Sequence, residues 1–135
     1  MKFWKYVSIA TAVALPLAFS LSAADPKLVH LSSIPESKVI TRTQPVYPPD
    51  AIAQGVQGTV RVSIIIGENG HVLDAKAVSG SRLLGPAAAQ SVRGWVFEPT
   101  TVEDHPVRVV TAVTVTFALD REGRPQAFGS TSLAK

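Results

Sequence analysis

The chain has 135 residues, of which 46% are hydrophobic and 17% charged, a composition typical of one globular domain with appendages. Its formal charge of +3 falls to +1 (11 basic minus 10 acidic residues) without the first 24 residues, which carry Lys2 and Lys5 and no acid. The other basic residues are spread among acids, so no nucleic-acid surface is predicted. The chain has no cysteine and only three separated histidines, so no disulfide and no metal site are predicted, and no cofactor is predicted either.

The N-terminus has the pattern of an export signal. Lys2 and Lys5 precede an apolar run from Tyr6 to Leu21, and Ser22-Ala23-Ala24 offers the small residues that a signal peptidase accepts. Residues 1–24 are therefore predicted to be a cleaved signal peptide, which places the remainder in the periplasm. An uncleaved inner-membrane signal anchor is the alternative, since the apolar run approaches the roughly 20 residues that a membrane span needs.

Residues 25–41 are polar, contain two prolines and show no helical or strand period, so they are predicted to be a linker with some ordered contacts. Residues 42–119 are predicted to form the domain. The segment 120–135, with Gly, Pro, Ser and Thr and no periodicity, is predicted to be a disordered tail.

Within the domain, residues 58–66 alternate between apolar and polar positions and predict a half-buried strand. The Asn69-Gly70 pair predicts a tight hairpin to a return strand at 71–78. An Ala-rich helix is predicted at 83–95, a short helix at 49–54 and a long strand at 106–119. The predicted core includes Val60, Val62, Ile64, Val92, Trp95, Phe97 and Phe117.

This order of elements predicts a two-layer α+β fold, in which a three-stranded antiparallel sheet packs on one main helix and a short N-terminal helix precedes it. Two of three strands must be edges, and unpaired edges invite pairing with another chain. The sequence therefore suggests a domain that binds a partner by strand addition.

An ordered set of residues resembles the TonB C-terminal domain from about Arg42 to Leu119. The set comprises Gln44-Pro45-Val46-Tyr47-Pro48, Ala51 to Gly55, Gly58, Gly67 to Gly70, Ser79-Gly80, Ala88, Trp95-Val96-Phe97-Glu98-Pro99, Pro106-Val107 and Phe117. Each element alone is common, and only the complete order is specific.

The resemblance implies a periplasmic domain that binds the TonB box of TonB-dependent outer-membrane receptors and contributes to energy-dependent transport, such as siderophore or nutrient uptake. In that family the box pairs as an added strand with the last long strand, which matches 107–119 here, and the segment matching 42–48 lies alongside. The implied partner-binding residues are Gln44, Pro45, Val46, Tyr47, Val107, Arg108, Val109, Thr111 and Val113.

Several alternatives stay open at this point. The chain could be a stand-alone periplasmic interaction or dimerisation module without energy coupling, including an edge-paired homodimer. The family also implies an inner-membrane motor complex as a partner, but its anchor carries a histidine, whereas no ionisable residue lies between Tyr6 and Ala24. Tyr47 could pack on the core, and Arg108 and Thr111 could be the ordinary polar face of a sheet.

No enzymatic activity and no catalytic residue are predicted. Ser79, Ser81 and Ser91 have no nearby histidine and acid in a recognisable arrangement, and the Gly67–Gly70 loop joins two strands rather than opening a phosphate-binding helix.

Overall fold

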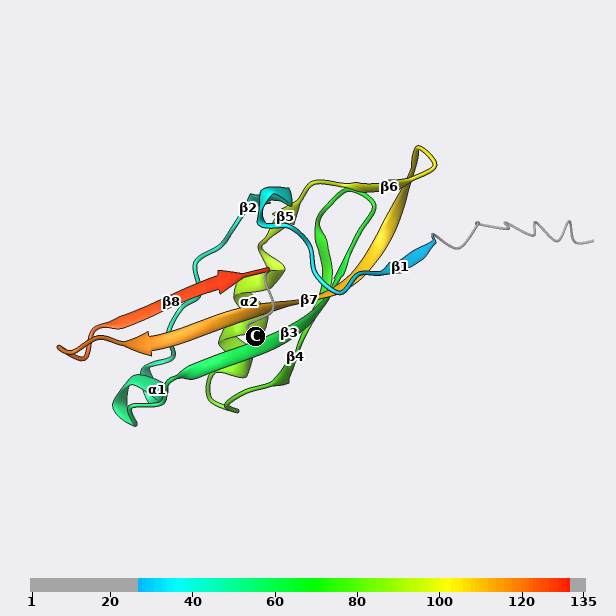
Figure 1. Cartoon of the computed structure of the whole chain (residues 1–135). Coiled ribbons are helices and arrows are strands. Elements are labelled where there is room, and N and C mark those ends of the chain that lie inside the picture. Colours follow the sequence, from blue (N-terminus) through cyan, green and yellow to red (C-terminus); the bar gives the residue numbers. More distant parts are fainter. Residues whose placement is uncertain (1–26, 132–135) are drawn as a thin grey trace, which may run out of the picture.

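The computed structural model describes residues 27–131, and the predicted signal segment 1–24 lies outside this range (Figure 1). Three strands with alternating apolar residues form the centre of the sheet: β3 (Gly58–Ile66), β4 (Val72–Ser79) and β7 (His105–Leu119). β3 lies between the other two and is antiparallel to both. The mixed α+β class predicted from the sequence is confirmed.

The β3–β4 hairpin depends on Gly70, which has φ of +86°. A Cβ atom at this position would lie 1.9 Å from the carbonyl oxygen of Phe97, so no other residue fits the present backbone. The Phe97 amide in turn donates to the Gly70 carbonyl at 2.8 Å. The turn therefore joins the hairpin to the segment that follows the main helix.

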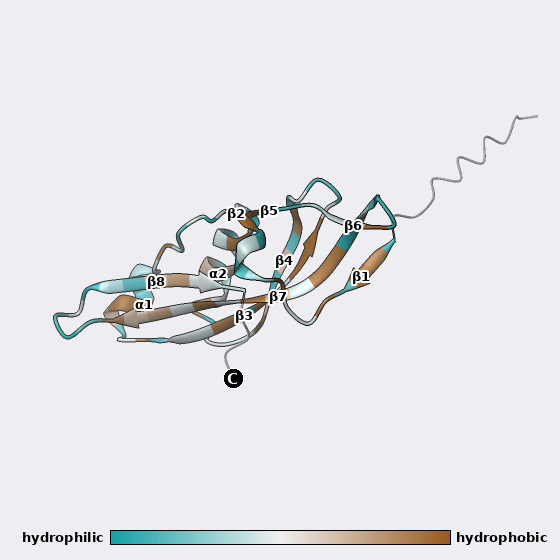
Figure 2. Cartoon of the chain, turned by 45° about the horizontal axis from the view of Figure 1, so that its top comes forward, coloured by the Kyte–Doolittle hydropathy of each residue, from teal (hydrophilic) through white to brown (hydrophobic). Residues whose placement is uncertain are grey.

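That main helix is α2 (Gly85–Arg93), which packs on β3 and β4 and buries Ala88 and Val92, among others. A short helix, α1 (Pro49–Ala53), begins with a proline in its first turn, where no amide hydrogen is needed. The seven predicted core residues are all at most 1% exposed: Val60, Val62, Ile64, Val92, Trp95, Phe97 and Phe117. Apolar positions concentrate on the sheet strands, as Figure 2 shows.

Three further strands pair with β7 and extend the main sheet to six strands. β6 (Thr100–Val102) forms a hairpin with β7, β1 (Leu28–His30) is parallel to it and β8 (Pro125–Ser130) is antiparallel to it (Figure 1). The prediction of a three-stranded sheet is therefore corrected. Its three strands exist, but β7 is a central strand with neighbours on both sides.

A second, two-stranded sheet pairs β2 (Val39–Thr41) with β5 (Val96–Phe97), and a 3-10 helix, η1 (Glu36–Lys38), precedes β2. The linker prediction for 25–41 is thus wrong for these residues and for β1. The disordered-tail prediction for 120–135 is wrong for β8. β1 and β2 are short and gain their order by pairing with distant segments, and β8 is a short strand that folds back on β7 through the turn at 120–124. No local period reveals any of the three.

No helix within residues 27–131 is both long enough and apolar enough to cross a lipid bilayer.

Candidate functional site: the outer edge of strand β7

The outer edge of β7, defined here as the edge that faces away from β3, is the place where strands from both flanks of the chain meet the sheet. In an antiparallel pair, the peptide groups of successive residues point alternately to the two sides of a strand. The Asp120 amide donates to the Arg124 carbonyl at 3.0 Å, so the even-numbered residues of β7 face β8. The odd-numbered residues consequently face β3.

This edge takes up strands in both directions. β8 pairs antiparallel with 114–119, and β1 pairs parallel with 108–110. At β1, the Arg108 amide donates to the Lys27 carbonyl at 3.1 Å and the Leu31 amide donates to the Val110 carbonyl at 3.0 Å. The outer edge of β7 is therefore able to hold extended segments of either orientation.

The predicted contact residues on β7 divide by this alternation. Val109, Thr111 and Val113 pair with residues of β3, and Val107 pairs with Thr100 of β6. These four side chains are buried. Their peptide groups lie on the inner edge, and Arg108 is the one predicted contact on β7 that directs its peptide group to the outer edge. Thr111 belongs to the buried side of the strand rather than to a polar face.

The predicted contact residues before α1 lie beside β8. Two adjoining hollows, of about 520 and 360 Å³, separate the segment 42–47 from β8, and both are lined by Gln44, Pro45, Ala127 and Phe128. Val46 is 76% exposed and lines a different hollow, against α2. The structure therefore brings Gln44 and Pro45 to the covered part of the outer edge.

Tyr47 packs on the core. Its ring meets Phe117 edge-to-face with centroids 5.3 Å apart, and its hydroxyl donates to the Val56 carbonyl. Burial raises the pKa of Tyr47. Tyr47 also lines one of the two hollows between the segment 42–47 and β8.

Trp95 connects the segment 42–47 to β8. Its indole nitrogen donates to the Thr43 carbonyl at 3.2 Å, and the Arg42 guanidinium lies 5.0 Å from the ring centroid. Gly129 of β8 lies so close to the ring that an added Cβ would be 2.2 Å from Cζ2. The glycine therefore allows β8 to lie flat against the indole.

Glu36 makes a second connection between the segment 42–47 and β8, which no sequence pattern indicates. Its Oε1 accepts hydrogen bonds from the Ser130 hydroxyl at 2.8 Å and the Thr131 amide at 2.6 Å, and its Oε2 accepts from Arg42. Partial burial would raise the pKa of Glu36, but the bonds from Arg42, Thr131 and Ser130 outweigh it and lower the pKa to about 2. We call these four residues the Glu36 cluster.

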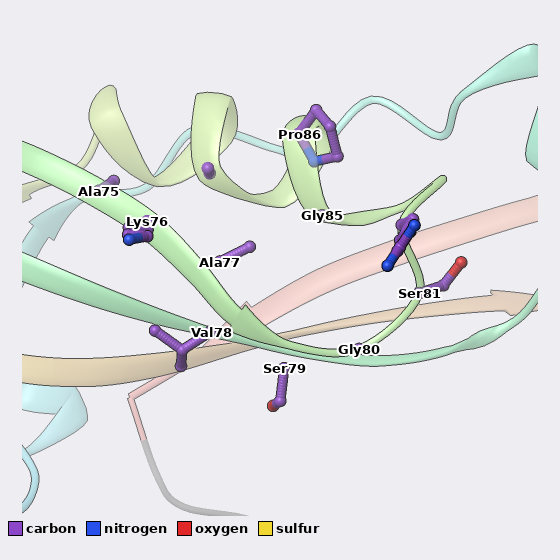
Figure 3. A pocket seen from close by; sticks show the side chains of 11 residues that line it. Ala75, Lys76, Ala77, Val78, Ser79, Gly80, Ser81, Gly85 and Pro86 are labelled. Carbon is purple, nitrogen blue, oxygen red and sulfur yellow. The ribbon is translucent and has the colours of Figure 1, made fainter.

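The opposite edge of the sheet, on β4, is capped at Ala75. The Ala75 amide donates to the Asp74 side chain at 2.9 Å, and the Ala75 carbonyl accepts from the Arg93 guanidinium at 3.2 Å. Beside it lies a hollow of about 440 Å³ lined by small residues of β4 and α2, including Ala77, Gly85 and Pro86 (Figure 3). At Ala75, side chains thus already make the hydrogen bonds that the backbone would make with an added strand.

Residues 27–131 contain no group of three His, Asp or Glu side chains that could hold a metal ion. Extended segments from both flanks of the chain pair with the main sheet at one strand, β7.

Comparison with known proteins gives the family. Residues 43–119 match the family described as Gram-negative bacterial TonB protein C-terminal, and the chain belongs to this family. It is 29% identical to a Protein TonB from Yersinia enterocolitica over 101 residues, which cover 73% of this chain and 40% of that protein. It is 36% identical over 78 residues to a Protein TonB from Xanthomonas campestris pv. campestris strain B100, covering 56% of this chain and 35% of that protein.

The chain therefore spans at most about two fifths of the length of these curated relatives. The matched range has a structural meaning as well. It contains β3, β4, α2 and β7, whereas β1 and β8, which cover the outer edge of β7, both lie outside it.

Proposed function

We propose that this TonB-family protein acts in the periplasm and binds the TonB box of outer-membrane receptors, by pairing the box as an added strand with the outer edge of β7. By this binding it contributes to energy-dependent uptake of siderophores or other nutrients. The bound box lies between two sets of contact residues. One set is Gln44, Pro45, Val46 and Tyr47, and the other is Arg108 with the even-numbered residues of β7.

One observation carries the proposal. The outer edge of β7 already holds one parallel and one antiparallel strand, and both come from outside the matched residues 43–119. Within the matched residues, this edge faces no other strand. Backbone hydrogen bonds along such an edge give affinity for an extended peptide, and pockets beside it select side chains.

The capped edge on β4 supports the same choice. Ala75 is capped by Asp74 and Arg93, so the β4 edge is a poor acceptor. Gln44 and Pro45, which the family resemblance implies as contacts, lie beside β8, the strand that covers residues 114–119 of the outer edge.

A titration of the isotope-labelled full chain with a synthetic TonB-box peptide from a receptor of the same organism tests this proposal by NMR. The largest shifts are expected at the amides of Thr114, Thr116 and Ala118 and at the Gln44 side chain. A scrambled peptide of the same composition is the control. Shifts confined to β4, or equal shifts with both peptides, would refute the proposal.

Gln44→Ala tests the side-chain contact, and Gln90→Ala is its matched control, because both glutamines line the hollow against α2 but only Gln44 also faces β8. Loss of one side-chain hydrogen bond is expected to cost about 1 kcal/mol, or about fivefold in affinity. Isothermal titration calorimetry with the same peptide measures this difference. Equal affinities for the two variants would remove Gln44 from the contact set.

A second function, self-association without energy coupling, is favoured by the far side of β8. The peptide groups of Ala127 and Gly129 point away from β7 and have no hydrogen-bond partner among residues 27–131. Two copies could pair through β8 if the strand of the second copy enters the hollows between β8 and the segment 42–47. Light scattering after gel filtration separates the candidates, since a dimer that forms at micromolar concentration and binds no peptide would favour this second function.

A further inference from the structure

Strand β8 lies where the proposed partner strand would lie. It pairs with residues 114–119 of β7, and its Ala127 and Phe128 line the hollows beside Gln44 and Pro45. A receptor segment could not make the same backbone hydrogen bonds while β8 is present, because each peptide group of β7 points to only one side.

The Glu36 cluster holds the end of this strand. One carboxylate accepts hydrogen bonds from Ser130 and Thr131 at the end of β8 and from Arg42 at the start of the segment 42–47. The segment 42–47 and β8, which line the two hollows, are therefore both attached to Glu36, a residue that precedes the matched family region. Bonds to a charged group are stronger than bonds between neutral groups.

β8 is attached on fewer sides than a central strand of the sheet, and this makes its release feasible. β8 pairs with a neighbour on one side only, and Phe128 is 57% exposed. β3, by contrast, pairs on both sides and buries three valine and isoleucine side chains completely. Elements with few buried contacts open at the lowest free-energy cost.

We infer that β8 occupies the position of the partner strand on β7 when no partner is bound. We also infer that the hydrogen bonds of Glu36 determine how readily β8 dissociates from β7. This inference rests on the proposed function. A partner must displace β8 to reach β7, so its apparent affinity is reduced by the fraction of molecules in which β8 is bound.

A disulfide across β7 and β8 tests the displacement. Thr116 and Phe128 are directly paired, and opposite residues in a hydrogen-bonded pair have Cα atoms about 5.5 Å apart, within the range of a disulfide. The chain has no cysteine of its own, so the Thr116→Cys, Phe128→Cys double variant forms a single bridge. Oxidation is expected to weaken binding of the TonB-box peptide at least about tenfold, and reduction should restore it. Equal binding in both states would overturn the inference.

Glu36→Ala tests the control by the cluster. With β8 held less firmly, the same peptide is expected to bind about fivefold more tightly than to the wild type. Glu98→Ala is the matched control, because Glu98 is also a surface glutamate with a basic partner, Lys38 at 2.9 Å, but does not touch β8. Unchanged or weaker binding by Glu36→Ala would overturn the role of Glu36.

A peptide-free measurement separates this inference from the proposed function. Amide hydrogen exchange at Thr116 and Phe128 is expected to be about fivefold faster in Glu36→Ala than in the wild type, and unchanged in Glu98→Ala. If the peptide binds neither the wild type nor the reduced cysteine variant, the proposed function fails, while faster exchange still supports the hold of Glu36 on β8. Unchanged exchange would overturn that hold whatever the peptide does.

Discussion

Glu36 is a carboxylate that remains ionised through most of the acid range. Its cluster contains one charged partner, Arg42, and the neutral groups of Ser130 and Thr131, while the nearby Lys38 is paired with Glu98. The pKa of the Glu36 carboxyl falls from 4.5 to about 2, which means that the hydrogen bonds of the folded state stabilise its ionised form. The cluster therefore stabilises β8 at neutral pH and does not act as a switch there.

The lowered pKa predicts a pH dependence of stability. Glu36 stabilises the fold above about pH 4.5, and this contribution is lost as the pH falls through the folded pKa of about 2. Because the side chain is 45% exposed, we expect no more than about 1 kcal/mol. Urea unfolding of wild type and Glu36→Gln measures the difference, which should be constant from pH 5 to 8 and shrink below pH 4.

The comparison with Glu36→Gln also removes the effect of Asp120, which is present in both proteins. Hydrogen bonds from the Arg124 and Glu122 amides and from the Arg124 side chain lower the pKa of Asp120 as well. A difference between the two proteins that grows towards pH 3 would contradict the assignment to Glu36.

Gly129 is the residue at which β8 is most sensitive to substitution. A Cβ would lie 2.2 Å from the Trp95 ring, and Trp95 is fully buried. Gly129→Ala is expected to destabilise the protein by about 1–3 kcal/mol through overpacking. Chemical denaturation followed by tryptophan fluorescence measures it, and the exposed Gln126→Ala on the same strand, expected within about 0.5 kcal/mol, is the control.

Among the elements, β3, β4, β7 and α2 could be predicted because each carries its own pattern. β3 alternates over nine residues, and α2 has an Ala-rich run after Pro86. β1, β2 and β8 carry no such pattern, since they have only three to six residues and are ordered by their partners. The hairpin at Glu103 and Asp104 was also missed, because both residues adopt positive φ without an Asn-Gly signal.

The candidate site could be predicted only in part for the same reason. The TonB resemblance drew attention to Gln44 and to β7, but the alternation of β7 alone does not tell which of its edges is covered. Glu36 had no signal at all, because a single glutamate in a polar segment is ordinary, and its partners Ser130 and Thr131 lie more than 90 residues away.

At the edge of β4, we expect the caps on Ala75 to prevent unwanted pairing. The double variant Asp74→Ala, Arg93→Ala frees the Ala75 amide and carbonyl, and an uncapped edge strand pairs with other chains. Concentration-dependent association in gel filtration with light scattering is the expected outcome. Arg82→Ala, which alters a basic residue beside the same hollow, should leave the protein unchanged. A monomeric double variant would show that the caps are dispensable.

Over the whole molecule, β7 receives both flanks of the domain. β1 enters before the matched region and β8 follows it, and both pair with the same edge of one strand (Figure 1). The 15-residue length of β7 makes this possible, because β3 covers its inner edge while two separate stretches of its outer edge remain for the flanks.

The parallel pairing of β1 has a mechanical consequence. Residue 27 lies at the His105 end of β7, so tension between residue 27 and the far end of β7 shears the short β1 ladder. β1 has only three paired residues and should separate before β3 does. Its release would add the chain from 28 to 33, up to about 20 Å, before the buried Ile34 bears the load. Optical tweezers attached at Lys27→Cys and Arg121→Cys should record this short step ahead of global unfolding, and a single unfolding event would rule it out. The N-terminal flank would thus lengthen under a small pull while the strand-binding edge beyond it keeps its shape.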